Sequence, residues 1–392
     1  MNLGTLLEMV AVNAADRVVL GSLDGGTTGS RLRATAVAGA HALRAADPGT
    51  VVFVGEGGPP FAAALLASAV AGIPFLPLNY RLTAPQLAEV VGRHPGAWVI
   101  ADDPSVIGES APNCRALHSS GSWLDVCDRP TGEPAWAGPA DDDVAVLLMT
   151  SGTTAAPKSA VLRHKHLTSY VLGSVELGSA EPDEAVIVSV PPYHIAAVAN
   201  LLSNLYRGRR IVYLSRFDGA GWLAAASRER VTHAMLVPTM LARVVSELEE
   251  GAVPAPAALR SLSYGGARIP PTVLRRALLA LPGVDFVNAY GLTETSSTVA
   301  VLTPEDHRQA LASADPGVAA RIASVGRPLP QVEIVIRRAD GSSCAPGENG
   351  QIFVRGEQVA GEYRETGRLT DADGWFATRD EGYLDRGGYL FV

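Results

Sequence analysis

Short apolar runs alternate with longer amphipathic stretches from about Val51 to Asp103. The runs VVFVG, FLPLN and AWVIAD are separated by PPFAAALLASAVAG and LTAPQLAEVVGRH. Because buried strands linked by crossover helices produce this rhythm, it predicts a parallel sheet with helices on its faces. The alternation resumes at DVAVLLMT and continues to DFVNAYG, with one helix expected over residues 194–206. The intervening stretch, about 108–139, is rich in Ser, Gly and Pro and is predicted to be a surface connection.

The pattern changes after about Pro304. The runs VEIVIRR, GQIFVRG and GYLFV are short and separated by turn residues, which predicts a small antiparallel sheet or barrel. We therefore expect α/β subdomains over residues 1–303 and a barrel-like subdomain over residues 304–392. The sequence ends within an apolar, strand-like run, where natural domains rarely stop, so we expect more protein to follow in the full-length product.

Composition narrows the classes of function. The 392 residues are 47% hydrophobic and 18% charged, with a net charge of −8, which is typical of a soluble globular protein and argues against a nucleic-acid surface. Three scattered cysteines (Cys114, Cys127 and Cys344) fit reduced thiols. The most apolar segment is interrupted by glycine and proline, and the N-terminus lacks a signal-peptide pattern. A cytoplasmic enzyme without stable membrane insertion is predicted.

The loop from Thr150 to Ser159 has the sequence TSGTTAAPKS and follows directly on a predicted strand. Its hydroxyls, glycine and lysine form a donor-rich segment that suits a polyphosphate, although a Ser/Thr-rich surface turn would have the same composition. Only two of the 32 basic residues are lysines, Lys158 and Lys165, so a lysine in this loop is unusual. A nucleotide-hydrolase phosphate loop is rejected, because Pro157 stands where that pattern needs glycine and has no N–H to donate.

Four further segments carry candidate chemistry: Tyr193-His194, Gly265-Gly266-Ala267, Asn288-Ala289-Tyr290-Gly291-Leu292-Thr293-Glu294 and Thr378-Arg379-Asp380. Taken singly, three of them have plainer interpretations: a histidine that caps a helix, a glycine turn, and a polar turn after a buried strand. With the loop, and in this order, the segments resemble those of adenylate-forming enzymes, the superfamily of acyl-CoA synthetases, adenylation domains and luciferases. The resemblance covers nearly the whole chain. It departs at Ala155, Ser159 and Arg379, where the family usually has glycine.

The resemblance assigns roles to these residues. Adenine would lie against residues 265–267 and stack on Tyr290, while Asp380 would accept the ribose hydroxyls. Lys158 and the loop would bind the β- and γ-phosphates, Thr293 the α-phosphate, His194 the acyl carboxylate, and Glu294 would hold Mg²⁺. The implied nucleotide-binding residues are Thr150, Ser151, Gly152, Thr153, Thr154, Gly265, Gly266, Ala267, Asn288, Ala289, Tyr290, Gly291 and Asp380, and the implied catalytic residues are Lys158, His194, Thr293 and Glu294.

The implied fold is α/β, with two stacked β/α subdomains in αβαβα layers plus the small barrel, as in the large N-terminal domain of an acyl-CoA synthetase. The implied reaction joins a carboxylic acid to ATP, giving acyl-AMP and pyrophosphate, and then transfers the acyl group to coenzyme A. Family members carry a C-terminal domain, with a further lysine for adenylation, beyond a hinge that would begin just past Val392. Residues 1–392 alone are thus expected to bind nucleotide and turn over poorly, and a homodimer is left open.

The acid is the least specified partner. The resemblance places it along the helix after His194 and behind residues 290–299. The implied lining is His194, Ala197, Val198, Gly291, Thr295 and Val299. These small, mostly apolar side chains favour a bulky hydrophobic or aromatic acid, and no basic residue stands there to pair with a second carboxylate.

Three alternatives stay open. The acyl group could pass to a carrier protein's thiol instead of coenzyme A. Ala155 and Ser159 stiffen the loop, which leaves room for a member that handles preformed acyl-adenylate better than it makes it. A non-catalytic module that binds an adenine nucleotide is the third. A kinase or ATPase would release ADP, whereas the adenylate-forming reaction releases AMP, so the nucleotide product separates these classes.

Overall fold

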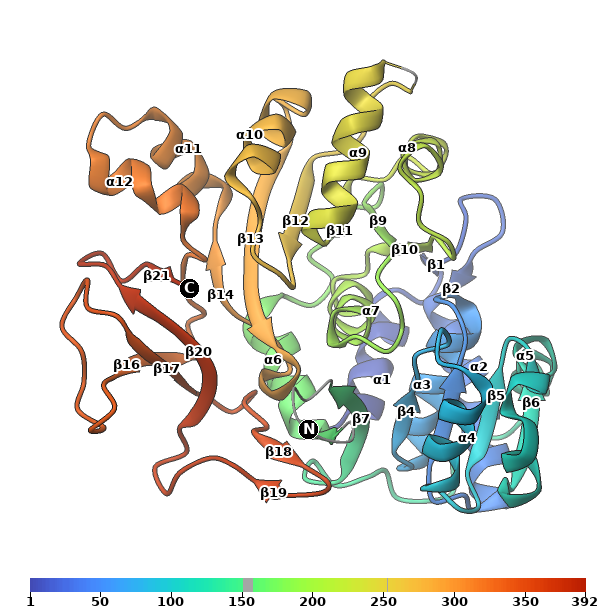
Figure 1. The fold of residues 1–392 in the computed structure, drawn as a ribbon. Coiled ribbons are helices and arrows are strands. Elements are labelled where there is room, and N and C mark those ends of the chain that lie inside the picture. The colour runs from blue at the N-terminus through green and yellow to red at the C-terminus, as the bar shows by residue number, and fades with distance from the viewer. Residues whose placement is uncertain (151–157, 252) are drawn as a thin grey trace.

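Two large sheets and one small sheet form the computed structural model, which describes residues 1–150, 158–251 and 253–392 (Figure 1). The first large sheet has the strand order β15 (Arg327–Pro328), β14 (Ser297–Leu302), β13 (Asp285–Leu292), β12 (Ser261–Gly265), β11 (His233–Leu236), β9 (Ala185–Val188), β10 (Arg210–Tyr213), β1 (Val18–Leu20), β2 (Thr27–Thr28). Its strands from β13 to β1 run parallel, and β14, β15 and β2 are antiparallel to their neighbours.

The second large sheet has the order β19 (Gly367–Arg368), β18 (Glu362–Tyr363), β8 (Lys158–Arg163), β7 (Val144–Thr150), β4 (Phe75–Pro77), β3 (Val51–Val54), β5 (Trp98–Ala101), β6 (Ala116–Ser119). Its strands from β7 to β6 are parallel, and β8 returns antiparallel to β7. All four residues of β3 and all four of β9 are buried, as expected for parallel strands covered on both faces.

Helices cover both large sheets. They are α1 (Leu3–Asn13), α2 (Gly29–Ala46), α3 (Pro59–Ala71), α4 (Ala84–Gly92), α5 (Ser120–Cys127), α6 (His164–Ser174), α7 (Ile195–Arg207), α8 (Gly219–Arg228), α9 (Pro238–Glu250), α10 (Pro271–Ala280), α11 (Pro304–Ala312) and α12 (Pro316–Ala320). Short 3₁₀ turns occupy Pro104–Asn113, Thr293–Thr295 and Arg321–Ala323. Where the chain is described, no helix is long and apolar enough to cross a bilayer.

The buried side chains divide into layers that match the predicted αβαβα arrangement. The largest apolar cluster joins α1, α2, α3, α6 and α7 to strands of both large sheets. A second cluster packs α8, α9 and α10 on the outer face of the first sheet, and a third packs α4 on the outer face of the second. The predicted α/β fold is therefore confirmed.

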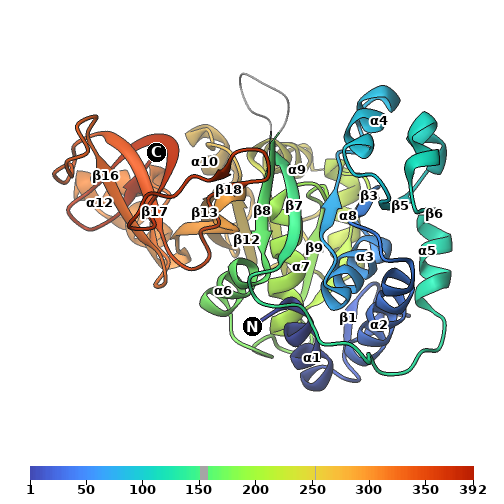
Figure 2. The same ribbon diagram turned by 90° about the horizontal axis from the view of Figure 1, so that it is seen from below.

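The small antiparallel sheet predicted near the C-terminus is also present. It has the order β16 (Glu333–Arg337), β17 (Gly350–Arg355), β20 (Phe376–Leu384), β21 (Leu390–Phe391), and its apolar face packs on Val299 and Ala300 of β14. Both views place it at the end of the molecule opposite β6 and α5 (Figures 1 and 2). Between β17 and β20 the chain leaves this sheet, and Tyr363 of β18 pairs with Ala160 of β8. This crossing carries a C-terminal segment onto the second large sheet.

The prediction of a surface connection over about 108–139 was wrong, because this stretch contains β6 and α5. β6 pairs in parallel with β5, and α5 buries Trp123, which is 0% exposed. One of the serines that suggested a loop stabilises the start of this helix. Ser119 accepts a hydrogen bond from the Ser122 N–H (3.1 Å) and so caps α5. A serine-rich composition therefore concealed a short, well-capped helix.

Candidate active site

A cavity of about 610 Å³ lies where the first large sheet meets the small sheet. Three segments that are far apart in the sequence line it, at the ends of β12, β13 and within β20. Of the predicted nucleotide-binding residues it brings together Gly265, Gly266, Ala267, Asn288, Ala289, Tyr290, Gly291 and Asp380. Apolar side chains of α10 and of the turn after α12 complete the lining.

Two glycines shape one wall of this cavity. Gly265 lies opposite Ala289 in the parallel pairing of β12 with β13. A Cβ atom on Gly265 would lie 2.1 Å from the Ala289 carbonyl oxygen, a contact that real Cβ atoms do not make. Gly266 has φ of 76°, in the left-handed region that glycine adopts without penalty. The wall is therefore bare backbone, which a flat ring can approach closely.

Tyr290 and Asp380 are joined across the cavity. The Tyr290 hydroxyl donates to Asp380 Oδ2 at 2.7 Å, and the Asp380 N–H donates to Thr378 Oγ1 at 3.1 Å. Burial, followed by the bond to the carboxylate, raises the pKa of Tyr290 well above its usual range, so the phenol stays protonated and acts as the donor. Asn288 is fixed nearby, because its side-chain N–H donates to the Ser324 carbonyl oxygen (3.1 Å).

Arg379 stands where the family usually has glycine, and its φ is 70°. The backbone beside Asp380 thus has a conformation that glycine adopts easily and that costs an arginine roughly 1–2 kcal/mol. The substitution is accommodated in a strained conformation.

Glu294 and Lys158 converge on a residue that sequence reasoning missed, Tyr363. The Tyr363 hydroxyl donates to Glu294 Oε1, and the Ala360 and Gly361 N–H groups donate to the Glu294 carbonyl oxygen at 2.9 and 3.0 Å. Lys158 Nζ lies 5.6 Å from the centre of the Tyr363 ring. Burial, with Glu294 second, raises the pKa of Tyr363 to about 12. Tyr363 comes from a two-residue strand that pairs with β8, and no local sequence pattern marks it.

The loop that was predicted to bind phosphate lies largely outside the described residues. The predicted nucleotide-binding residues Ser151, Gly152, Thr153 and Thr154 are not described, and neither are Ala155 and Pro157. Its two flanks are described. Thr150 ends β7, Lys158 begins β8, and the two residues lie opposite each other in the antiparallel pairing. This pair of residues stands beside Tyr363, because the Thr150 side chain hydrogen-bonds Tyr363.

His194 and Thr293 stand at the starts of two helical turns. His194 is the residue before α7, and its ring centre lies 4.5 Å from that of Tyr193, which in turn contacts Tyr80. Loss of solvation, with the charge of Arg81 second, lowers the pKa of His194, so the imidazole is neutral at pH 7. Thr293 opens the 3₁₀ turn that also carries Glu294, which is only 8% exposed.

A second cavity, of about 260 Å³, lies against α7 on the other side of β13. Ala289 lines both cavities. Four residues predicted to line the acyl pocket are buried in the packing around this cavity and are not among its lining residues: Ala197, Val198, Thr295 and Val299. Their neighbours line it instead, among them Ala196, Asn200 and Thr298, because one stripe of α7 and alternate residues of the strands face the space.

Basic residues line this cavity, although the sequence stretches expected to form the acyl site contain none after His194. Arg207, Arg209 and His233 are among its lining residues. They come from the last turn of α7, the residue before β10, and the first residue of β11. The sequence interpretation covered the helix over residues 194–206 and residues 290–299, and the three basic residues lie outside these stretches.

A family model of AMP-binding enzymes matches residues 7–364. The chain belongs to this family. Feruloyl-CoA synthase from an Amycolatopsis species is 33% identical to this AMP-binding enzyme over 364 residues, which are 90% of the present chain and 70% of that protein. The resemblance to adenylate-forming enzymes is thus confirmed, and so is the prediction of an AMP-forming acyl-CoA synthetase.

Solved structures show the same fold. The N-terminal domain of FACL13 from Mycobacterium tuberculosis superposes with a TM-score of 0.85 at 23% identity, covering 100% of this AMP-binding enzyme and 98% of that chain. The o-succinylbenzoate CoA synthetase MenE from Bacillus subtilis, solved with its acyl-adenylate intermediate, has a TM-score of 0.83 at 26% identity, covering 99% and 98%. The same enzyme has been solved with ATP and a magnesium ion, at a TM-score of 0.83, covering 99% and 78%.

Proposed function

We propose that the cavity between β12, β13 and β20 binds the adenosine of ATP and that the α7 cavity binds the acid. The observation that carries this proposal is the convergence of residues 265–267, 288–291 and Asp380 on one space, with Ala289 shared by the second. Adenine would lie on the bare backbone at Gly265 and against Tyr290, and the ribose hydroxyls would donate to Asp380. The acid would meet the nucleotide near Gly291 and Thr293.

The reaction requires little covalent chemistry from the protein. A carboxylate oxygen attacks the α-phosphorus, the bond to the bridging oxygen of pyrophosphate breaks, and acyl-AMP forms. In the second step a thiolate attacks the acyl carbon and AMP leaves. Because charge builds on the phosphoryl oxygens, the protein's contribution is orientation and electrostatic stabilisation. We assign Thr293 to the α-phosphate, Lys158 and the loop to the outer phosphates, and neutral His194 to a hydrogen bond with the acyl carboxylate.

Glu294 fits a magnesium ligand, because it offers a carboxylate oxygen from a rigid turn. When bound, magnesium would neutralise charge on the phosphate oxygens. The Tyr363 hydroxyl orients the carboxylate, and Lys158 Nζ lies 5.6 Å from the centre of the Tyr363 ring. No group of three or more potential ligand side chains is found in the described part of the chain, so water and phosphate oxygens would complete the coordination.

The acceptor in the second step is proposed to be coenzyme A, in line with the name of the feruloyl-CoA synthase relative. Transfer to a carrier-protein thiol, or preferential use of preformed acyl-adenylate, stays open. A cytoplasmic location and a further C-terminal domain remain predictions. Residues 1–392 alone should bind acyl-AMP and turn over slowly, and full-rate thioester formation by this segment would contradict that expectation.

Pyrophosphate exchange into ATP by the full-length protein tests the proposal directly. Lys158→Ala and Glu294→Ala should each reduce exchange at least 100-fold, because each removes a charge that acts on the phosphates. Lys165→Ala is the matched control, since Lys165 is the other lysine and pairs at the surface with Asp142. Wild-type exchange in the Lys158→Ala and Glu294→Ala variants would reject these roles. Release of ADP instead of AMP would reject the reaction class.

A further inference from the structure

The α7 cavity extends along the whole helix. One face of α7 lines it at a spacing of three and four residues: Ala196, Ala199, Asn200, Ser203, Asn204 and Arg207. At 1.5 Å of rise per residue this face is about 16 Å long. Its first residue lies two positions after His194, so the cavity begins near the expected site of the reacting carboxylate. The space therefore accommodates an acid with a substantial body.

The side chains that line the cavity are small at one end of this length and polar at the other. On the strand side, Ala289 and Thr298 lie at the end near the nucleotide cavity, and the next row along the sheet contains Met235, Ser263 and Val287. The row beyond it pairs His233 with Ser261, at the starts of β11 and β12. On the helix side Arg207 stands at the same far end. The far end is thus the polar one.

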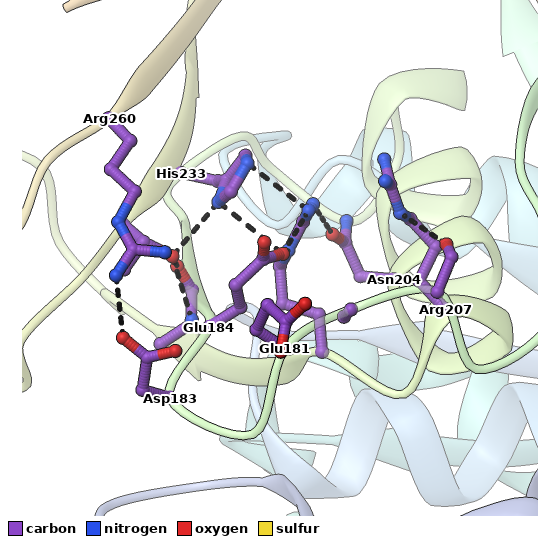
Figure 3. Close-up of polar contacts among 12 residues, drawn as sticks. Glu181, Asp183, Glu184, Asn204, Arg207, His233 and Arg260 are labelled. Carbon is purple, nitrogen blue, oxygen red and sulfur yellow. Dashed lines mark hydrogen bonds and ion pairs between the residues drawn. The ribbon is translucent and has the colours of Figure 1, made fainter.

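Most charges at the far end neutralise one another (Figure 3). Arg209 donates to Glu184 Oε2 at 2.8 and 2.5 Å and to Asn204 Oδ1 at 2.9 Å. Burial, followed by the Arg209 charge, lowers the pKa of His233 to about 4, and Arg209 lies 3.2 Å from His233 Nε2, so the ring is neutral and accepts this bond. Arg260 pairs with Asp183 at 2.6 Å.

Arg207 differs from these arginines. Its Nε donates to the hydroxyl of Ser179 at 3.2 Å, and among the described residues it has no carboxylate within ion-pair distance. Glu184 interacts electrostatically with Arg207, but its Oε2 accepts its hydrogen bonds from Arg209. The Arg207 guanidinium therefore brings a positive charge without an ion pair of its own, together with further N–H donors, to the wall of the cavity. Guanidinium groups bind carboxylates with two parallel hydrogen bonds, a geometry that a lysine or a hydroxyl does not offer.

We propose that the acid activated by this enzyme carries a second carboxylate at its far end, bound by Arg207. This inference rests on the proposed function of the α7 cavity. The length of the lined face and the reach of the arginine side chain set the separation of the two carboxylates on the order of 10 Å. The small side chains near Ala196 and Ala289 would surround the apolar body between them.

The pyrophosphate-exchange assay tests this proposal when acids of the same length but with different terminal groups are compared as substrates. Dicarboxylic acids of graded chain length are compared with monocarboxylic acids of the same length and with the corresponding ω-hydroxy acids. At one length the dicarboxylic acid should be preferred at least 10-fold in kcat/KM over both analogues. Arg207→Leu should abolish this preference, and Arg207→Lys should retain part of it.

A cation in the last turn of a helix also stabilises that helix, so Arg207→Leu could lower activity through a loss of stability. The deciding quantity is therefore the ratio of kcat/KM for the dicarboxylic acid to kcat/KM for its analogues, because a loss of stability alone does not change this ratio. Arg260→Leu is the matched control, because Arg260 is a neighbouring arginine outside the cavity lining, and it should keep the wild-type ratio. A monocarboxylic or ω-hydroxy acid preferred at every length overturns the inference, as does a preference that survives Arg207→Leu. Exchange with monocarboxylic acids alone leaves the proposed function standing, whereas exchange with no acid at all defeats both.

Discussion

The backbone at Arg379, beside the cavity-lining residue Asp380, has a conformation that is unfavourable for an arginine, at a position where the family usually has glycine. Its φ of 70° places an arginine in the left-handed region. Arg379→Gly should therefore raise the free energy of unfolding by up to about 1 kcal/mol, because relief of strain outweighs the added flexibility of glycine in the unfolded chain. Urea denaturation measures this change.

The same substitution separates strain from function when it is compared with Arg230→Gly. Arg230 also has a positive φ, of 50°, and is absent from the lining of the nucleotide cavity. Both variants should gain stability, but only Arg379→Gly should alter the KM for ATP, since Arg379 precedes Asp380, the proposed acceptor for the ribose hydroxyls. A loss of stability in both variants would show that neither arginine is strained.

A different prediction concerns Gly265, where the surrounding atoms leave no room for a side chain. In Gly265→Ala the new methyl group would lie 2.1 Å from the Ala289 carbonyl oxygen, and this backbone atom cannot move without disturbing β13. We expect a loss of about 1–3 kcal/mol in stability and a weakened affinity for ATP. Gly283→Ala is the matched control, because a Cβ there meets nothing within 4 Å. Equal ATP affinity in the two variants would contradict the proposed adenine wall.

At the scale of elements, α7 and the strands beside it depend on a buried ion pair. The Arg209 side chain is 6% exposed and that of Glu184 is 13% exposed. Burial is the largest influence and raises the pKa of Glu184, but the hydrogen bond to Arg209 and the charges of Arg209 and Arg207 together lower it below its usual value, so the carboxylate is ionised. Arg209→Met should cost about 3–5 kcal/mol, because it leaves this carboxylate buried without its partner.

A second substitution tests the cause of that loss. Glu184→Gln in the Arg209→Met background removes the uncompensated charge and should recover most of the stability, which a double-mutant cycle with urea unfolding would measure. If the double variant is as unstable as Arg209→Met alone, packing of the arginine, and not its charge, is the important contribution.

The periodicity of apolar residues predicted the helices and strands that have continuous apolar repeats. It was less informative for short elements. The parallel strands and the antiparallel C-terminal sheet were visible because their apolar runs are continuous. β6 and α5 were missed, because a helix of eight residues with serine and glycine in its first turn has almost no apolar repeat. The sequence also does not show which stripe of α7 faces the cavity beside it, which is lined by Ala196 and Asn200 and not by the predicted Ala197 and Val198.

For the whole molecule, segment order predicted which distant segments line one cavity, whereas the residues that join these segments could not be predicted. Tyr363 reaches Glu294 only because β18 crosses to the second large sheet. The same crossing brings Arg163 against Glu362, at 2.8 to 3.1 Å, and Arg364 against His94. Tyr363 and Glu294 are 69 positions apart, and the other two pairs are 199 and 270 positions apart, so no local pattern predicts these contacts.

Buried histidines are expected to make the stability of the whole fold sensitive to acid. Burial is the largest cause that lowers the pKa to about 4 in each of four histidines: His94, His164, His166 and His233. His164, which is 0% exposed, accepts a hydrogen bond at Nδ1 from the Leu3 N–H (3.2 Å) and thereby joins α6 to the start of α1. Protonation of its ring would therefore disturb a contact between two helices of the central layer.

The sign of the pH effect follows from these lowered values. Above about pH 6.5 the histidines are neutral in both the folded and the unfolded chain. As the pH falls from 6.5 towards 4, the unfolded chain binds protons that the folded chain excludes, so the free energy of unfolding decreases. Below about pH 4 the folded chain is protonated as well, and this contribution becomes constant.

His164→Gln isolates one of these groups. The variant should be less stable than the wild type at pH 7.5, because it loses the packing of the ring. The difference in the free energy of unfolding between the variant and the wild type should shrink by roughly 3 kcal/mol as the pH falls from 6.5 to 4, because only the wild type is destabilised by excluding a proton from His164. Urea midpoints at several pH values give this difference directly, and the carboxylates shared by the two proteins cancel in it. Parallel stability curves for the two proteins would show that His164 does not contribute to the acid sensitivity.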